Sequence, residues 1–170
     1  MKFLAAFAGG LAGAVTVTIL HELTRKLDSS APRLDLLGEN AAQKLAKKAG
    51  YEPPTGKSLY AGSLAGSILT NTLTYSLAGM SGKKPFSMGT LLGAAMGWSA
   101  VKLPNKLGLS GQHSNGSSKR RWITMALYIT GGLVASAISR RIEKKHRQKP
   151  LVSPYKAPDE AWKPVLDIVV

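Results

Sequence analysis

The sequence predicts an all-α protein, an integral membrane bundle of four Gly/Ala-rich transmembrane helices. Four runs without a charged residue cover positions 3–20, 58–82, 85–101 and 122–139. Each has the roughly 17–25 residues that a helix needs to cross a bilayer. All 23 Lys and Arg residues and all 9 Asp and Glu residues lie outside these runs. Each run also carries small residues spaced by four, a pattern typical of helix contacts in membranes.

The first run, 3–20, is expected to be an uncleaved membrane helix. A signal peptide is one alternative, because Lys2 precedes the run and Ala6-Phe7-Ala8 has the form of a cleavage site. Only residues 3–5 would precede that site, fewer than the roughly 7–15 apolar residues that such a signal needs. A soluble four-helix protein is the other alternative. It is disfavoured because this run offers water only the hydroxyl groups of Thr16 and Thr18.

A polar segment, 21–57, separates the first two spans and should contain a short helix. Pro32 can begin this helix and Gly50 can end it. Its apolar residues gather on one side and its lysines lie away from that side, so the helix is amphipathic and basic. Two placements remain open: flat in the lipid headgroup layer, or in water against the membrane domain.

The second and third spans, 58–82 and 85–103, should form an antiparallel hairpin because a tight turn at 81–85 joins them. Pro104 then ends the third span, and the fourth covers 122–139. We predict a membrane domain over 1–149. The remainder, 150–170, is rich in proline and should be an extended tail.

Small residues let two helix backbones approach closely in lipid, where helix contact brings no hydrophobic gain. We expect the 89–97 stripe to contact the 58–82 span. Leucine at position 93 should then disrupt packing, and alanine at position 89 should be milder. A stripe left without a partner in the chain would favour a homo-oligomer or a larger membrane complex. The residues predicted to pack helices are Gly9, Gly13, Gly62, Gly66, Gly89, Gly93, Gly97, Gly131 and Ala135.

The span 58–82 carries a second, polar stripe that includes Ser67, Asn71 and Thr74. Asn71 lies near the middle of the span, where an unpaired amide group is costly, so it should form a hydrogen bond across the bundle. One interpretation is structural, with the stripe joining helices; the other is a path for a solute. No charged residue or histidine lies in any of the four charge-free runs, which disfavours ion-coupled transport.

Motifs for catalysis and metal binding are incomplete. The chain has no Cys, which excludes a disulfide, a thiolate metal site and a thiol nucleophile. His21-Glu22 begins like the HExxH zinc motif, but Arg25 stands where the second histidine belongs. Gly56-Lys57-Ser58 resembles the end of a P-loop, but no glycine begins the motif at position 51. We therefore expect no metal, no cofactor and no enzymatic activity.

The net charge of +14 favours anionic membrane lipids as partners. Nucleic acid is disfavoured because no aromatic residues interleave with the basic run 140–149. Basic residues divide almost evenly between the two ends of the bundle, so orientation depends on this densest run, which favours cytoplasmic termini. The predicted headgroup contacts are Arg140, Arg141, Lys144, Lys145 and Arg147.

Three functions are compatible with these patterns. The first is a small multi-pass membrane protein that acts as a structural or accessory subunit through helix packing. The second is a pore or carrier for a neutral solute along the polar stripe of the second span. The third is an enzyme at the membrane interface that uses His21, Glu22 and Asp28, the acidic and imidazole groups nearest one another in the sequence there.

Overall fold

The computed structural model describes residues 2–82 and 84–147, and all regular structure within them is helical. The all-α prediction is therefore confirmed for this part of the chain, and the predicted tail, 150–170, lies outside it. The elements are α1 (Lys2–Leu27), α2 (Leu34–Lys48), α3 (Gly56–Met80), α4 (Pro85–Lys106), α5 (Gln112–Asn115) and α6 (Ser118–Arg147).

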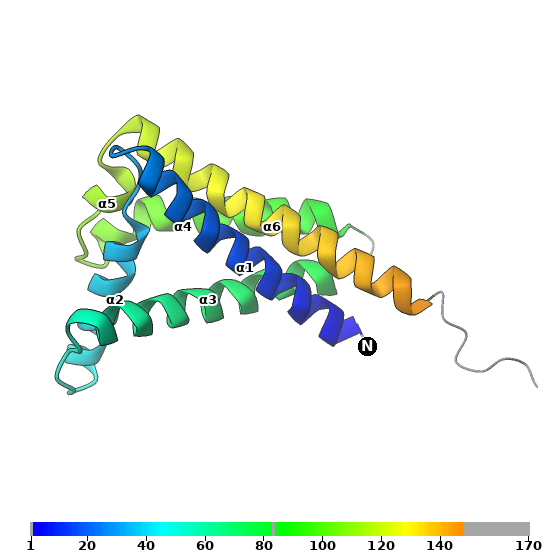
Figure 1. Ribbon diagram of the computed structural model, residues 1–170, viewed down its shortest axis with the longest axis horizontal. Helices are drawn as coiled ribbons and strands as arrows, with labels where there is room; N and C mark the ends of the chain where they lie inside the picture. The colour runs from blue at the N-terminus through cyan, green and yellow to red at the C-terminus, as the bar shows by residue number, and fades with distance from the viewer. Residues whose placement is uncertain (1, 83, 148–170) are drawn as a thin grey trace, which may run out of the picture.

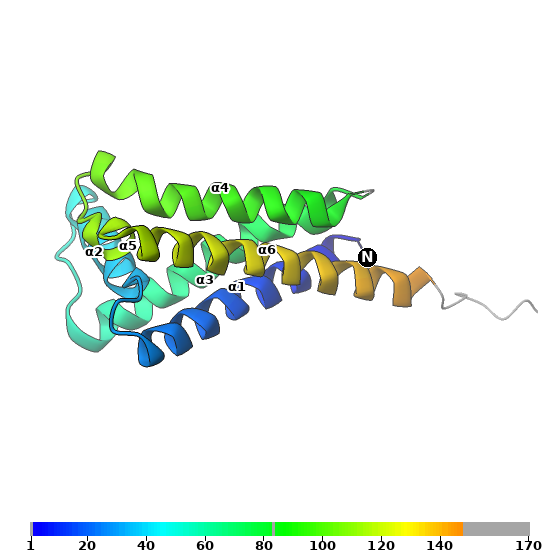
Figure 2. The same cartoon turned by 90° about the horizontal axis from the view of Figure 1, so that it is seen from above.

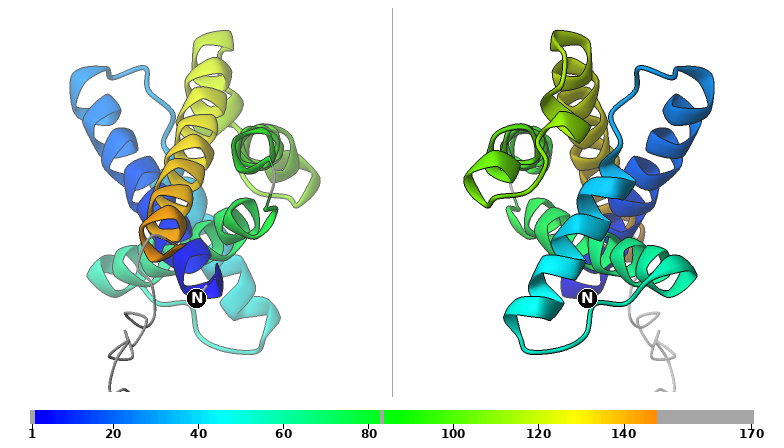
Figure 3. Two further views of the ribbon diagram at one scale, coloured as in Figure 1. Left: turned by 90° about the vertical axis from the view of Figure 1, so that its right-hand side faces the viewer. Right: turned by 90° about the vertical axis from the view of Figure 1, so that its left-hand side faces the viewer.

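Four long helices, α1, α3, α4 and α6, form an elongated bundle in which successive helices run in opposite directions (Figures 1 and 2). The N-terminus, the α3–α4 turn and the last turns of α6 lie at one end, which we call the termini end. Helices α2 and α5 lie at the other, the α2 end (Figure 3). Because the chain passes along the bundle four times in alternating directions, the start of α1 and the end of α6 lie at the same end.

Helix α1 crosses α3 and α6 at close range because glycines form its inner face. A Cβ atom at Gly9 would lie 2.5 Å from the carbonyl oxygen of Ala135 in α6. A Cβ atom at Gly10 would lie 2.9 Å from the backbone nitrogen of Ser76 in α3. Neither distance is possible for a real carbon atom, so these crossings require glycine.

Helix α4 packs mainly on α6, and the expectation that its glycine stripe contacts the 58–82 span is wrong. A Cβ atom at Gly93 would lie 2.5 Å from the carbonyl oxygen of Tyr128, and one at Gly97 would lie 3.0 Å from the Cα atom of Met125. A tight turn brings two helix ends together, but it does not decide which face each helix buries. Gly89 lies against the backbone of Gly132, so even alanine has no room there.

Two helices, Lys2–Leu27 and Ser118–His146, are long and apolar enough to cross a membrane. The helices α3 and α4 are of similar length, 25 and 22 residues, but fall short of the same measure of hydropathy. Hydroxyl groups and Asn71 lower the hydropathy of α3, and glycines and Lys102 lower that of α4. Of the four predicted spans, the described structure thus supports two, by length and composition alone, and the four-span bundle is not confirmed.

Helix α2 lies against the bundle at the α2 end and has no fully buried residue. Gly38 faces α3, and a Cβ atom there would make ordinary van der Waals contact with Ser67 Oγ, at 3.5 Å. The ammonium group of Lys44 donates a hydrogen bond to the carbonyl oxygen of Leu107, beyond the end of α4. Leu45 on the same helix is 69% exposed. Helix α2 is thus attached to the bundle and keeps one apolar side chain outside it.

Candidate functional site

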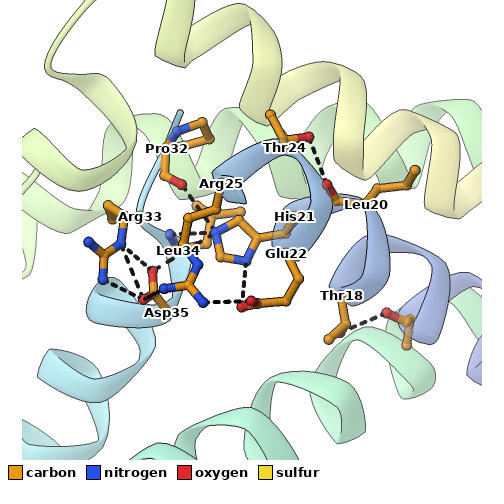
Figure 4. Close-up of polar contacts among 11 residues, drawn as sticks. Thr18, Leu20, His21, Glu22, Thr24, Arg25, Pro32, Arg33, Leu34 and Asp35 are labelled. Carbon is orange, nitrogen blue, oxygen red and sulfur yellow. Dashed lines mark hydrogen bonds and ion pairs between the residues drawn. The ribbon is translucent and has the colours of Figure 1, made fainter. Parts of the chain in front are cut away.

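The most densely charged cluster of the described residues joins the end of α1 to the start of α2 (Figure 4). His21 and Asp35 are its buried members, each with a side chain that is 8% exposed. Glu22, Arg25 and Arg33 surround them. Burying charged groups is costly unless they are paired, so the pairing within this cluster decides how it can act.

The imidazole ring of His21 caps the N-terminus of α2. Its Nε2 atom lies 3.2 Å from the backbone nitrogen of Leu34, the first residue of α2, and 3.1 Å from the carbonyl oxygen of Pro32. A single ring nitrogen either accepts the N–H group of Leu34 or donates to Pro32, because the two roles need different tautomers. Without a protein acceptor, that N–H group is one of the donors that every helix start leaves unpaired.

Two carboxylates and two guanidinium groups balance each other in the cluster. Arg33 donates from Nε and Nη2 to Asp35 at 3.0 and 2.8 Å, a bidentate pair. Arg25 donates to Glu22 at 2.6 Å, and its other terminal nitrogen lies 3.7 Å from Asp35. Burial of Asp35 raises the pKa of its carboxyl group. The hydrogen bonds from Arg33 and from the N–H group of Leu36 outweigh this, so the net pKa lies below the ordinary value.

A small cavity of about 70 Å³ lies beside this cluster, between α1, α2, α3 and α6. His21, Glu22 and Asp35 line one side, and Ser63, Ser67 and Asn71 of α3 line the other. The structure therefore brings the interfacial histidine and the polar stripe of the second span to one place, which sequence reasoning treated as separate features.

Two members of that stripe behave differently from what the sequence predicted. Asn71 is 7% exposed and lines the cavity, but among the described residues its amide group forms no hydrogen bond to another helix. Thr74 is not part of the cavity; its hydroxyl group donates to the carbonyl oxygen of Thr70 within α3, at 2.9 Å. The expected cross-bundle bond comes instead from Tyr75, which donates to the carbonyl oxygen of Tyr128 in α6.

Asp28 does not join His21 and Glu22, so the expected third member of the interfacial site is wrong. Its carboxylate lies 2.6 Å from Nζ of Lys119 and accepts hydrogen bonds from Ser30. The residue that approaches His21 is Asp35, with Oδ1 3.9 Å from Nε2. Sequence reasoning missed Asp35. The available signal was an acidic residue in the first turn of a helix that begins after Pro32.

The predicted packing glycines fall into two groups. Gly131 fits against Val17 and against the ring of Tyr75, whose Cε2 atom would lie 3.0 Å from an added Cβ atom. Gly62 and Gly66 on α3 are exposed, and no described atom lies within 4 Å of where their Cβ atoms would be. Within the described part of the chain this pair therefore packs against no other helix, and its predicted packing role stays a prediction.

The basic run of α6 lies at the termini end, where Arg140 and Lys144 line a second cavity of about 200 Å³. The guanidinium carbon of Arg140 lies 5.7 Å from the ring centre of Phe86, a cation–π contact with α4. Arg141 and Lys145 are exposed. The side chain of Arg147 lies outside the described part of the structure.

Comparison of the chain with protein-family models, curated proteins and solved structures finds no match.

Proposed function

We propose that the protein is a four-span integral membrane protein that acts as an accessory subunit, and that the exposed Gly62–Gly66 face of α3 docks on a helix of a partner membrane protein. The observation that carries this proposal is the contrast between this pair and the other packing glycines. The glycines at 9, 13, 89, 93, 97 and 131 all face a neighbouring helix. In contrast, no described atom lies within 4 Å of where the Cβ atoms of Gly62 and Gly66 would be.

A membrane location for all four long helices is supported by the apolar side chains that they turn outward. In water so many exposed apolar side chains would favour association, whereas in a bilayer they are the expected lipid-facing residues. The helices α3 and α4 are also long enough to cross at 1.5 Å per residue. Exposed examples on each helix are Phe7, Leu11 and Ile19; Leu69, Leu73 and Leu77; Phe86 and Leu91; and Leu133.

The Gly62–Gly66 pair suits a partner helix because it removes side chains from one strip of α3. Each glycine in a helix interior costs about 1 kcal/mol relative to alanine, so an exposed pair is a cost without a benefit inside the chain. Glycines four residues apart let a second backbone approach closely enough for dispersion contacts. A partner helix that also carries small residues would recover the lost stability.

The test is to enlarge this face and follow the partner. Gly62→Leu combined with Gly66→Leu should abolish co-purification of the partner from native membranes, while the thermal stability of the isolated chain stays unchanged. Ala126→Leu combined with Ala137→Leu adds similar bulk to exposed positions of α6 and serves as the matched control. Purification of the native chain as a lone monomer would contradict the proposal. Release from membranes by carbonate at high pH would contradict the membrane location itself.

Orientation forms part of this proposal. The termini end carries the dense basic run of α6, and the positive-inside rule would place that end in the cytoplasm. A C-terminal reporter that is active only in the cytoplasm should therefore be active on the native chain. If this reporter is inactive, and a reporter that is active only in the periplasm or lumen is active at the same position, the proposed orientation is wrong.

A second candidate function is a carrier for a small neutral solute, because the polar stripe of α3 does line a cavity with His21. Ser67→Leu would fill part of this cavity. If the protein is a carrier, reconstituted vesicles should take up small neutral solutes, and this variant should reduce the uptake several-fold. Equal uptake by both proteins would remove the candidate.

A further inference from the structure

A cavity of about 200 Å³ lies at the termini end, between the α3–α4 turn and α6. Figures 1 and 2 show the start of α4 beside the C-terminal part of α6 at this end. The lining residues that carry the argument are Gly79, Pro85, Ser139, Arg140 and Lys144. Glu143 also lines the cavity and takes part in a polar or electrostatic interaction of its own.

Two cationic side chains of α6 face this cavity from one side of the helix. Arg140 and Lys144 are four residues apart, so they lie one turn apart on the same face. Arg140 is held in place because its guanidinium group lies over the ring of Phe86, in the first turn of α4. A positioned guanidinium group recognises a phosphate group through paired N–H donors.

The N-terminus of α4 adds a second source of positive potential. Pro85 is at its first turn, and no side chain caps the helix, so the first N–H groups lack a side-chain acceptor. The hydroxyl group of Ser136 in α6 donates to the carbonyl oxygen of Pro85 at 2.8 Å, which fixes this helix start against α6. The partial positive charge of a helix N-terminus favours an anion at this position.

Ser139 supplies the observation that points to a missing ligand. This residue is 3% exposed, and among the described residues its Oγ atom has no hydrogen-bond partner. The atom lies where α1, α3 and α6 meet, because an added Cβ atom at Gly9 would clash with it and one at Gly79 would be 2.6 Å away. Gly79 and Ser139 line the cavity and Gly9 does not, so the unpaired hydroxyl group lies at the inner edge of the cavity wall. A buried donor without an acceptor costs free energy that an anionic oxygen would recover.

We propose that this cavity binds the phosphate group of an anionic phospholipid, through Arg140, Lys144, Ser139 and the N-terminus of α4. A lipid is the fitting source because the apolar surface of α1 and α4 begins beside the cavity, with Phe3, Leu4 and Phe86 exposed there. The acyl chains would lie along that surface while the headgroup enters the cavity. This proposal rests on the membrane location given above, but not on the docking role of α3.

The experiment measures binding of dioleoylphosphatidylglycerol to the full chain in detergent by native mass spectrometry, with dioleoylphosphatidylcholine as the neutral comparison. Arg140→Gln with Lys144→Gln should weaken phosphatidylglycerol binding about tenfold or more, since hydrogen bonds to charged groups are the strong ones. Arg141→Gln with Lys145→Gln changes the charge of the same helix equally and should change binding less than about twofold. If both double variants lose affinity for phosphatidylglycerol equally, the lipid is attracted by the general positive charge of α6, and the proposed site is wrong.

Ser139→Ala provides a variant that leaves the packing intact, because it removes Oγ and keeps Cβ. Its melting temperature without lipid should match that of the native chain, while its affinity for phosphatidylglycerol should fall several-fold. Unchanged affinity would overturn the role of Ser139. Inorganic phosphate should stabilise the native chain far less than the lipid does. If phosphate alone stabilises it equally, or if phosphatidylcholine binds equally, the assignment to an anionic lipid is wrong.

Discussion

The hydroxyl group of Tyr75 donates a hydrogen bond to the backbone carbonyl oxygen of Tyr128 across 2.7 Å. This bond joins α3 to α6 at the level where Gly13 of α1 crosses both helices, and the Tyr75 side chain is fully buried there. Val17 and Ala135 complete the same core cluster. Three helices are therefore fixed to one another at a single level of the bundle, through one ring and the glycines around it.

Removal of this hydroxyl group should destabilise the bundle modestly, and removal of the ring should destabilise it strongly. Tyr75→Phe should lower the free energy of unfolding by about 1 kcal/mol, the usual net value of a hydrogen bond. Tyr75→Ala should cost about 3–5 kcal/mol because it also leaves a cavity. Thermal unfolding in detergent measures both changes. Tyr60→Phe, at a residue that is 39% exposed, is the control and should change little.

Alanine should have opposite effects at the two kinds of glycine. Gly131→Ala places a methyl group against the ring of Tyr75 and should cost about 1–3 kcal/mol through overpacking. Gly62→Ala meets no described atom within 4 Å and should be neutral or should stabilise the lone chain by up to about 1 kcal/mol. Chemical denaturation of the purified monomer compares them. Equal destabilisation by both variants would contradict the assignment of Gly62 to an external face.

Helix positions and their order could be predicted from the sequence because a long charge-free run has few alternatives to a helix. The helix faces that contact one another could not be predicted from the sequence. The 89–97 stripe contacts α6 and not α3, since a four-residue spacing of glycine is equally compatible with any neighbour that offers room. The proximity of His21 and Asp35 could not be predicted either, because it depends on how the segment 28–33 turns α2 back onto α1. Asp28 is nearer in sequence, yet it pairs with Lys119 on α6.

Loss of the imidazole ring of His21 should loosen the start of α2 and leave the four long helices intact. His21→Phe keeps the volume of the side chain and removes the nitrogen that reaches the N–H group of Leu34. A missing N-cap acceptor typically costs about 1 kcal/mol, so amide hydrogen exchange at residues 34–37 should become about fivefold faster. Amides in the middle of α1 and α6 should keep their rates. Faster exchange throughout the bundle would show a general packing role instead.

Acid should destabilise the junction of α1 and α2 through Asp35. The net pKa of this carboxyl group lies below its ordinary value of 3.8: burial raises it, but the hydrogen bonds from Arg33 and from the Leu36 N–H group lower it by more. The folded protein thus holds the proton less tightly than the unfolded chain. The stabilisation is fully present above the ordinary pKa and is lost as the pH falls toward the lower folded value.

The melting temperature in detergent should therefore stay level from about pH 6 to pH 5 and fall steeply below about pH 4. Asp35→Asn should melt lower at pH 6, because Arg33 and Arg25 lose a shared carboxylate, and its melting temperature should fall less in acid. Part of the acid sensitivity will remain in this variant, since hydrogen bonds from Lys119 and Ser30 also lower the pKa of Asp28. Asp28→Asn should remove that remainder. An Asp35→Asn variant that keeps the full native slope would show that another group controls the acid transition.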